Sequence, residues 1–362
     1  MIQEPKIFSY KEAFMRFYTK QHKFYCGIDL HAKTMYLCIL DQESKILLHR
    51  DIKTNPDIFL KTIAPYREDI VVAVECIFTW YWLADLCSKE NIPFVLGHAL
   101  YMKAIHGGKA KNDKIDAYKI ASLLRGGMMP MAYVYPSDMR STRDLLRRRN
   151  HLARKRAELI AHIQNTNHQY NFDDLGRISR KCDRNKTDVA NRFPDPSVQK
   201  TIELDISLIE HFDKLLNHLE HELSLIAKVH DADSYFRLRS IPGIGRVLGL
   251  SILYEIHDIS RFPSVQDFVS YCRLVKCAKE SAGKIMGTSG KKIGNAHLKW
   301  AFSEAAVLFL RRNPEAIKYR AKLERKHGKA KSLSILAHKL ARAVYNILKK
   351  KEVFHPETFF AK

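Results

Sequence analysis

The chain has 362 residues, too many for one ordinary domain, and its hydrophobic fraction of 46% is enough to build buried cores. Lys and Arg number 61 against 39 Asp and Glu, which gives a net charge of +22 and a pI near 9.6. This excess favours nucleic acid as the partner; the alternatives are a basic surface without such a role, or ribosome association. No apolar stretch approaches the ~20 residues of a membrane span, and the first residues lack a secretory signal pattern, so we expect a cytoplasmic protein without a membrane partner.

Residues 1–135 contain alternating strand-like and helical patterns. Strand-like runs occur at 24–30, 34–41, 45–51, 70–76 and 93–97, and helical patterns at 56–65, 79–90 and 113–125. Three adjacent strands followed by alternating helix and strand predict a mixed α/β domain on one central sheet.

Four acids in this region stand out by context. Asp29 and Glu75 each end a predicted buried strand, and Asp113 and Asp116 share one face of a predicted helix. Strand ends of such a sheet meet at one edge, where gathered carboxylates would repel one another unless Mg²⁺ neutralised them. The alternatives are an acid beside a hairpin turn for Asp29, an ordinary strand-end residue for Glu75, and favourable first-turn charges for the Asp pair.

Residues 136–230 lose the strand signal and show heptad-like apolar spacing. Ile209, Phe212, Leu216, Leu219, Leu223 and Ile226 step by 3 and 4 residues, as in a coiled-coil seam. We therefore predict an antiparallel helical arm of two helices joined by a polar tip. Its first helix carries a block of six cations without an acid, for which we expect nucleic-acid contact rather than a merely solvated face. The block comprises Arg147, Arg148, Arg149, Arg154, Lys155 and Arg156.

Residues 231–362 are predicted to be mainly α-helical. Near their start, "IPGIGRVLGL" places Gly243 and Gly245 between two amphipathic segments, the layout of a helix-hairpin-helix. Glycines allow a sharp turn and leave backbone N–H groups at a helix start free for a phosphate. A simple tight turn is the alternative.

Three blocks of the N-terminal region, "GIDLHAKTMYLCILD", "VVAVECIFTWYWLADL" and "KNDKIDAYKIASLL", resemble the D, E and DxxD blocks of DEDD transposases of bacterial insertion sequences, the IS one-ten family. The stretch from "ISRFPSVQDF" to "GNAHLKWAFSEAA" resembles the C-terminal transposase block of the same family. The resemblance implies a RuvC-like, RNase H-type fold for residues 1–135, followed by the arm and a helical transposase domain with a serine motif.

Carried over by position, the resemblance implies that Asp29, Glu75, Asp113 and Asp116 bind Mg²⁺, with Mn²⁺ as a substitute, and that Ser281 forms a covalent link to DNA. Ser289 in "GTSGKK" is the competing serine.

The same block suggests roles for other residues near Ser281. Lys284, Lys291 and Lys292 are expected to clamp phosphates, and Asn295 to orient the loop. The chain departs from the family at Arg273 and Ala282, where members commonly have glycine.

The resemblance also implies the partners: donor and target DNA, a non-coding bridge RNA that pairs with both, and further copies of the chain in a dimer or tetramer, in a bacterial, nucleoid-associated protein. The leading hypothesis is a transposase that moves its own element through a Mg²⁺-dependent serine–DNA intermediate. The alternatives are a site-specific invertase of the same family, a RuvC-like Holliday-junction nuclease in which Ser281 is incidental, and a non-catalytic nucleic-acid-binding protein.

Overall fold

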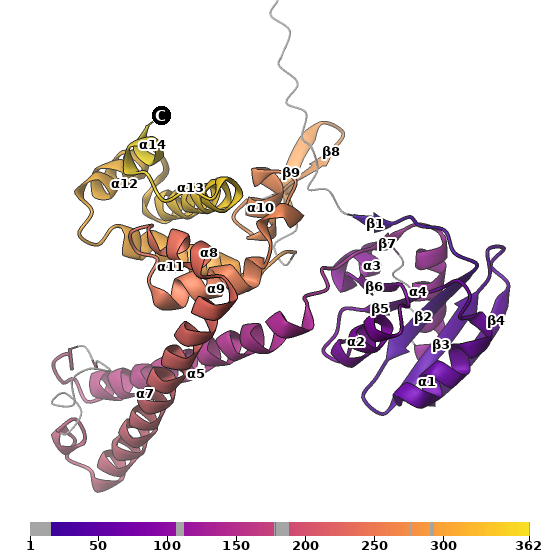
Figure 1. Ribbon diagram of the computed structural model, residues 1–362. Helices are drawn as coiled ribbons and strands as arrows, with labels where there is room; N and C mark the ends of the chain where they lie inside the picture. The colour runs from indigo at the N-terminus through magenta and orange to yellow at the C-terminus, as the bar shows by residue number, and fades with distance from the viewer. Residues whose placement is uncertain are drawn as a thin grey trace, which may run out of the picture. The chain divides into compact units, whose positions relative to one another are not determined.

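The computed structural model describes residues 16–105, 112–176, 178, 188–275, 277–289 and 293–361. The chain divides into two compact units, one up to Ser137 and one from Asp138 onward (Figure 1). Within the described ranges, no helix is both long and apolar enough to cross a membrane.

A five-stranded sheet in the order β4-β3-β2-β5-β6 forms the centre of the first unit. Its strands are β2 (Phe24–Leu30), β3 (Thr34–Leu40), β4 (Ile46–Lys53), β5 (Ile70–Glu75) and β6 (Phe94–Gly97). β2, β3 and β4 pair antiparallel, whereas β5 and β6 continue the sheet parallel to β2. Beside them, β1 (Phe17–Tyr18) pairs with β7 (Met129–Pro130). The predicted mixed α/β N-terminal region is confirmed, with strand ends within a residue or two.

Helices cover both faces of this sheet (Figure 1). α1 (Pro56–Ile63), which leads into a short 3₁₀ turn, η1 (Ala64–Tyr66), and α2 (Tyr81–Lys89) share one apolar core with the sheet. α4 (Asp113–Arg125) packs on the opposite face, together with α3 (Ala99–Ile105), which the sequence did not predict.

Gly27 allows α4 to cross β2 at backbone contact. A Cβ atom at this position would lie 2.2 Å from the backbone nitrogen of Ala121 and 2.5 Å from the carbonyl oxygen of Ala117. Because side chains alternate along a strand, Asp29 lies on the same face as Gly27. The crossing therefore brings the first turn of α4, which carries Asp113 and Asp116, over the end of β2.

The second unit is mostly helical, as predicted. Its helices are α5 (Ser137–Gln169), α7 (Pro196–His230), α8 (Ala232–Arg239), α9 (Arg246–Ile256), α10 (Val265–Tyr271), α11 (Ala296–Phe309), α12 (Pro314–His327), α13 (Lys329–Lys350) and α14 (Pro356–Phe360), with short 3₁₀ turns η2 (Ala190–Arg192) and η3 (Ile259–Arg261). One large apolar core joins α8 to α14 with the start of α5. An antiparallel hairpin, β8 (Cys277–Ser281) and β9 (Lys284–Ser289), interrupts the helices and was not predicted.

α5 and α7 are joined by ion pairs along their length. Arg149 binds Glu220, Arg156 binds Asp213, and His162 lies 2.6 Å from Asp205. The partner numbers fall as the α5 numbers rise, so the two helices run antiparallel. Buried residues recur every seven positions on α7, at Ile202, Ile209, Leu216 and Leu223.

Candidate active site

Three side chains meet at the end of β2. His31, in the turn after this strand, has Nε2 3.4 Å from Oδ2 of Asp29 and 3.5 Å from Oδ2 of Asp113, the first residue of α4. Ligand atoms of these three residues lie within 4.8 Å of one another, the only such group in the described part of the chain that could hold a metal ion. The His31 and Asp113 side chains are 49% and 56% exposed and that of Asp29 only 18%, so the cluster opens to solvent on one side.

Local hydrogen bonds fix both segments that supply the cluster. Asn112 caps α4, its Oδ1 accepting from the backbone N–H of Ile115 at 2.7 Å. On the strand side, the Thr54 hydroxyl donates to the carbonyl oxygen of His31 at 2.9 Å. His49 lies 2.9 Å from the carbonyl oxygen of Lys114 in the first turn of α4. The cluster is thus held by backbone contacts and does not depend on its own ion pairs alone.

The electrostatics of Asp29 favour a bound cation. Burial raises the pKa of the Asp29 carboxyl, and the nearby charges of Asp113 and Asp116 raise it further, while His31 lowers it. Crowded carboxylates of this kind are relieved by a divalent cation, and their oxygens are the ligands that Mg²⁺ prefers. The imidazole of His31 widens the choice toward Mn²⁺ and other transition metals. The residues present therefore fit a divalent metal ion held by Asp29, Asp113 and His31.

The other two predicted acids lie close by. β2 and β5 are parallel neighbours, and Ile28 pairs with Val74. The next residues along the two strands, Asp29 and Glu75, therefore lie side by side on the same face of the sheet. Glu75 is half-buried at the end of β5 and is not a member of the three-residue group. Asp116 acts on Asp29 through its charge, and its Oδ1 lies 3.4 Å from Nζ of Lys119.

His31 was not among the residues predicted from sequence. A lone histidine in a turn carries little signal, but its position two residues after Asp29 could have indicated that both belong to one site, because residues i and i+2 share a side of a strand.

Ser281 lies at the tip of the β8–β9 hairpin. It pairs with Lys284 across a two-residue turn, in which Ala282 and Gly283 have φ values of 50° and 73°. Positive φ at both central residues is the geometry of a type I′ turn. The side chains of Ser281 and Lys284 are exposed. The side chain of Ser289, and Lys291 and Lys292 altogether, lie outside the described residues.

Asn295 belongs to a buried polar network. Its Oδ1 caps α11 by accepting from the backbone N–H groups of His297 and Leu298, and its Nδ2 donates to Glu255 at 2.7 Å. Glu255 also accepts from Arg143 and Arg147 of α5. Asn295 thus fixes the start of α11, and its predicted role in orienting the loop near Ser281 stays a prediction.

The six arm cations separate into two groups. Arg147, Arg149 and Arg156 bind Glu255, Glu220 and Asp213, so the mutual repulsion that favoured a nucleic-acid partner for them is relieved within the chain. Arg148, Arg154 and Lys155 are exposed instead. Of these, Lys155 pairs with the exposed Glu158 at 2.7 Å, whereas Arg148 and Arg154 form no ion pair among the described residues.

The two glycines of the predicted helix-hairpin-helix differ. A Cβ atom at Gly243, where φ is +85°, would lie 2.5 Å from the backbone nitrogen of Phe309, so packing and turn geometry require this glycine. Gly245 is the N-cap of α9 and has open space around it. The tight-turn alternative therefore explains Gly243, and only Gly245 is placed where a phosphate could approach.

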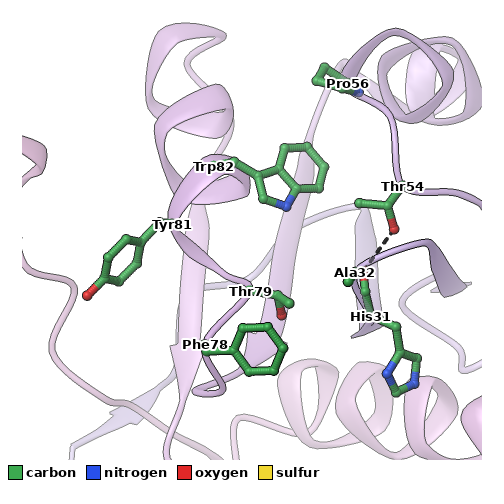
Figure 2. Close-up of a pocket in the computed structure, with 8 residues that line it drawn as sticks. All are labelled: His31, Ala32, Thr54, Pro56, Phe78, Thr79, Tyr81 and Trp82. Atoms are coloured by element: carbon green, nitrogen blue, oxygen red, sulfur yellow. Dashed lines mark hydrogen bonds between the residues drawn. The ribbon is translucent and has the colours of Figure 1, made fainter.

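An open pocket of about 510 Å³ adjoins the acidic cluster and shares His31 with it (Figure 2). Its lining comes from the segments that follow β2, β4 and β5 and from the start of α2. The residues are His31, Ala32, Thr54, Pro56, Phe78, Thr79, Tyr81 and Trp82.

Comparison with known proteins identifies one family of transposases. A DEDD transposase model of the IS110 family, described as "Transposase", matches residues 26–172, and a second model, "Transposase IS116/IS110/IS902 family", matches residues 235–321. The transposase for insertion sequence element IS1111A of Coxiella burnetii is 23% identical over 335 residues, which cover 91% of this chain and 90% of that protein. The two models together span more than half of the chain, and the chain belongs to the IS110 family of insertion-sequence DNA transposases.

Proposed function

We propose that this transposase excises and inserts its element through a Mg²⁺-dependent covalent serine–DNA intermediate, with the acidic cluster as the metal centre of a RuvC-like domain. The observation that carries the proposal is the meeting of Asp29, His31 and Asp113 at an open sheet edge, with Asp116 and Glu75 beside them. Mn²⁺ is the expected substitute, because one ligand of the cluster is an imidazole.

In this mechanism the Ser281 hydroxyl attacks a DNA phosphorus. A bond forms between Oγ and phosphorus, one bond between phosphorus and a deoxyribose oxygen breaks, and that oxygen leaves as a hydroxyl. Attack by another DNA hydroxyl reverses the step and releases the serine. A divalent ion held by Asp29, His31 and Asp113 would activate the hydroxyl and would stabilise the negative charge that develops at the phosphate.

The residues around Ser281 support this role. The exposed hairpin tip gives its hydroxyl access to a strand, and Lys284 opposite it offers a positive charge to the phosphate. We infer that the hydroxyl is brought to the acidic cluster within a dimer or tetramer. Lys291 and Lys292 remain predicted phosphate contacts.

We further propose that a non-coding bridge RNA recognises donor and target DNA by base pairing, so that the protein holds nucleic-acid backbones. The charge of +22 and the exposed Arg148, Arg154 and Lys155 support backbone contact along the arm, which we infer to be a coiled coil from the heptad-spaced burial on α7. The N-terminus of α9 at Gly245 is a second proposed phosphate contact. RNase treatment that leaves activity and co-purified nucleic acid unchanged would remove the RNA from this proposal.

The serine step is tested by trapping the protein–DNA adduct and mapping the modified peptide. We expect the adduct on Ser281, lost in Ser281→Ala and retained in Ser289→Ala, with DNA binding kept in both variants. An adduct on Ser289 would reassign the nucleophile. Hydrolytic DNA cutting by Ser281→Ala without any adduct would support a metal nuclease and contradict the serine mechanism.

A further inference from the structure

The pocket beside the acidic cluster has an aromatic wall that the metal site does not use. Figure 2 shows Phe78 and Trp82 on one side of the pocket and Thr54, Ala32 and His31 on the other. Its volume of about 510 Å³ lies within the ~300–1,000 Å³ typical of sites that bind small ring-containing groups.

Phe78 is the most unusual residue of this wall, because 85% of it is exposed. An exposed phenyl ring leaves apolar surface in water, and a ligand that covered the ring would gain free energy from burying it. Trp80, two residues later, is only 5% exposed and belongs to the core beneath the sheet. The turn between β5 and α2 therefore buries one of its aromatic rings, Trp80, in the core and presents another, Phe78, to the pocket.

The two threonines of the pocket are occupied in holding its walls. The Thr79 hydroxyl donates to the carbonyl oxygen of Leu30 at 3.0 Å, and the Thr54 hydroxyl donates to that of His31. Both bonds tie the pocket walls to the end of β2, where Asp29 lies. The pocket is thereby fixed relative to the cluster, and His31 borders both.

We propose that this pocket takes one unstacked nucleobase of the DNA strand, the base next to the phosphate that is cut at the acidic cluster, with Phe78 and Trp82 as its stacking surface. The proposal rests on the function proposed above, since it needs the scissile phosphate at Asp29 and Asp113. Aromatic side chains stack on any unstacked base, because every base has a π-face, and such stacking is worth ~1–3 kcal/mol per base.

DNA is favoured over RNA as the source of the base. The family's reaction joins and breaks DNA, and His31 places the pocket directly beside the side chains that would hold the metal at the cut. A base of the guide RNA would instead have to lie at the reacting phosphate without being part of the reacting strand.

The test uses the full-length protein with its co-purified nucleic acid and a duplex of its element end, carrying 5-iodouracil at each position flanking the cut. We expect photo-crosslinks to Phe78 or Trp82 from one of these positions. Phe78→Leu should weaken DNA binding or raise KM about tenfold, equivalent to about 1.4 kcal/mol, whereas Phe78→Tyr, which keeps a ring, should resemble the wild type. Ile46→Ala, at a residue 47% exposed where β4 begins, at the other end of the sheet, is the matched control.

The outcomes separate this inference from the proposed function. Wild-type binding and cutting by Phe78→Leu, or the absence of crosslinks to Phe78 and Trp82 from every labelled DNA position, would overturn the pocket assignment. If Asp29→Asn stays active, the metal-centre proposal fails instead, and with it the reason to place a scissile phosphate beside the pocket, whatever the crosslinks show.

Discussion

Two carboxylates of this chain, Asp29 in the first unit and Glu255 in the second, have their pKa values shifted in opposite directions. Burial raises the pKa of Asp29, and the neighbouring Asp113 and Asp116 add to the effect. Burial would also raise the pKa of Glu255, but hydrogen bonds and charges from Arg147 and Arg143, with Asn295, outweigh it and lower the pKa to about 2.

The difference separates a structural acid from a ligand-binding one. Glu255 has its countercharges within the protein, so it needs nothing further and acts as a joint between α5, α9 and α11. Asp29 is surrounded by like charges and one half-exposed histidine, an arrangement that a cation from solvent would stabilise. An uncompensated acid at an open edge therefore indicates a ligand site more strongly than burial or a shifted pKa alone.

Removing the buried structural acid should give the largest effect. Glu255→Gln removes the carboxylate charge that Arg143 and Arg147 share, and we expect a loss of about 3–5 kcal/mol in the free energy of unfolding, measured by urea denaturation. Glu222→Gln removes an exposed partner of His218 on α7 and should change the free energy by less than about 0.5 kcal/mol. Equal effects of the two substitutions would contradict the structural role of Glu255.

The lowered pKa of Glu255 also predicts that the free energy of unfolding falls at acid pH. The pKa of Glu255 falls from 4.5 in the unfolded chain to about 2 in the folded one, so its contribution is complete above about pH 5 and is lost as the pH falls toward 2. This contribution amounts to about 3 kcal/mol. Urea titrations at several pH values should show a steeper loss of stability in this window for the wild type than for Glu255→Gln. Parallel curves would show that Glu255 is not the responsible group.

Asp29→Asn tests whether Asp29 is the ligand-binding acid of the two. Substitutions around the ligands of a metal commonly cost 10–100-fold, so a direct ligand should cost more than about 100-fold in strand cleavage, measured with DNA binding as a parallel readout. Because the raised pKa of Asp29 means that its charge destabilises the fold, the variant should be at least as stable as the wild type at pH 7. This stability difference should disappear as the pH falls below the ordinary Asp pKa of about 3.9, where the carboxyl is neutral in both the folded and the unfolded chain. Glu43→Gln, at an exposed acid in the turn after β3, should leave both activity and stability unchanged.

Sequence patterns could predict what depends on local periodicity. The strands follow from runs of apolar, aromatic and β-branched residues, and α4 and the two long helices follow from helical and heptad spacing. Asp29, Asp113 and Asp116 stand out by their place in these elements. Glu255 was missed because nothing in "ILYEI" distinguishes it from a surface acid, and Arg143, its partner, is 112 residues away. The hairpin was missed because "CAKESAGKIMGTS" lacks clear alternation. Long-range partners of charges are thus the information that the sequence pattern lacks.

Substituting the exposed cations of the arm should have a smaller effect, which appears in the salt dependence of nucleic-acid binding. We expect Arg148→Ala with Arg154→Ala to lower the slope of log Kd against log salt by about 2, one for each lost phosphate contact, without loss of stability. Arg156→Ala removes one ion-pair partner of the buried Asp213 and should lower the free energy of unfolding while leaving the slope unchanged. If instead Arg156→Ala changes the slope and the double variant does not, the exposed side of α5 is not the nucleic-acid surface.

The smallest effect concerns the hairpin that carries Ser281. The two departures from the family's glycines, Arg273 and Ala282, both have left-handed backbone, with φ values of 55° and 50°. A non-glycine residue costs about 1–2 kcal/mol there, partly offset by the greater unfolded-state freedom of glycine, so Ala282→Gly should stabilise the hairpin by about 0.5–1 kcal/mol. Amide hydrogen exchange across β8 and β9 measures this local change. Arg273→Gly is the informative contrast, because Nε of Arg273 donates to the Gly294 carbonyl at 2.9 Å. The loss of this hydrogen bond should cancel the stability gained by placing glycine at a left-handed position. Faster exchange in Ala282→Gly would show that the alanine is not strained, and the hairpin would then owe its shape to contacts other than its turn.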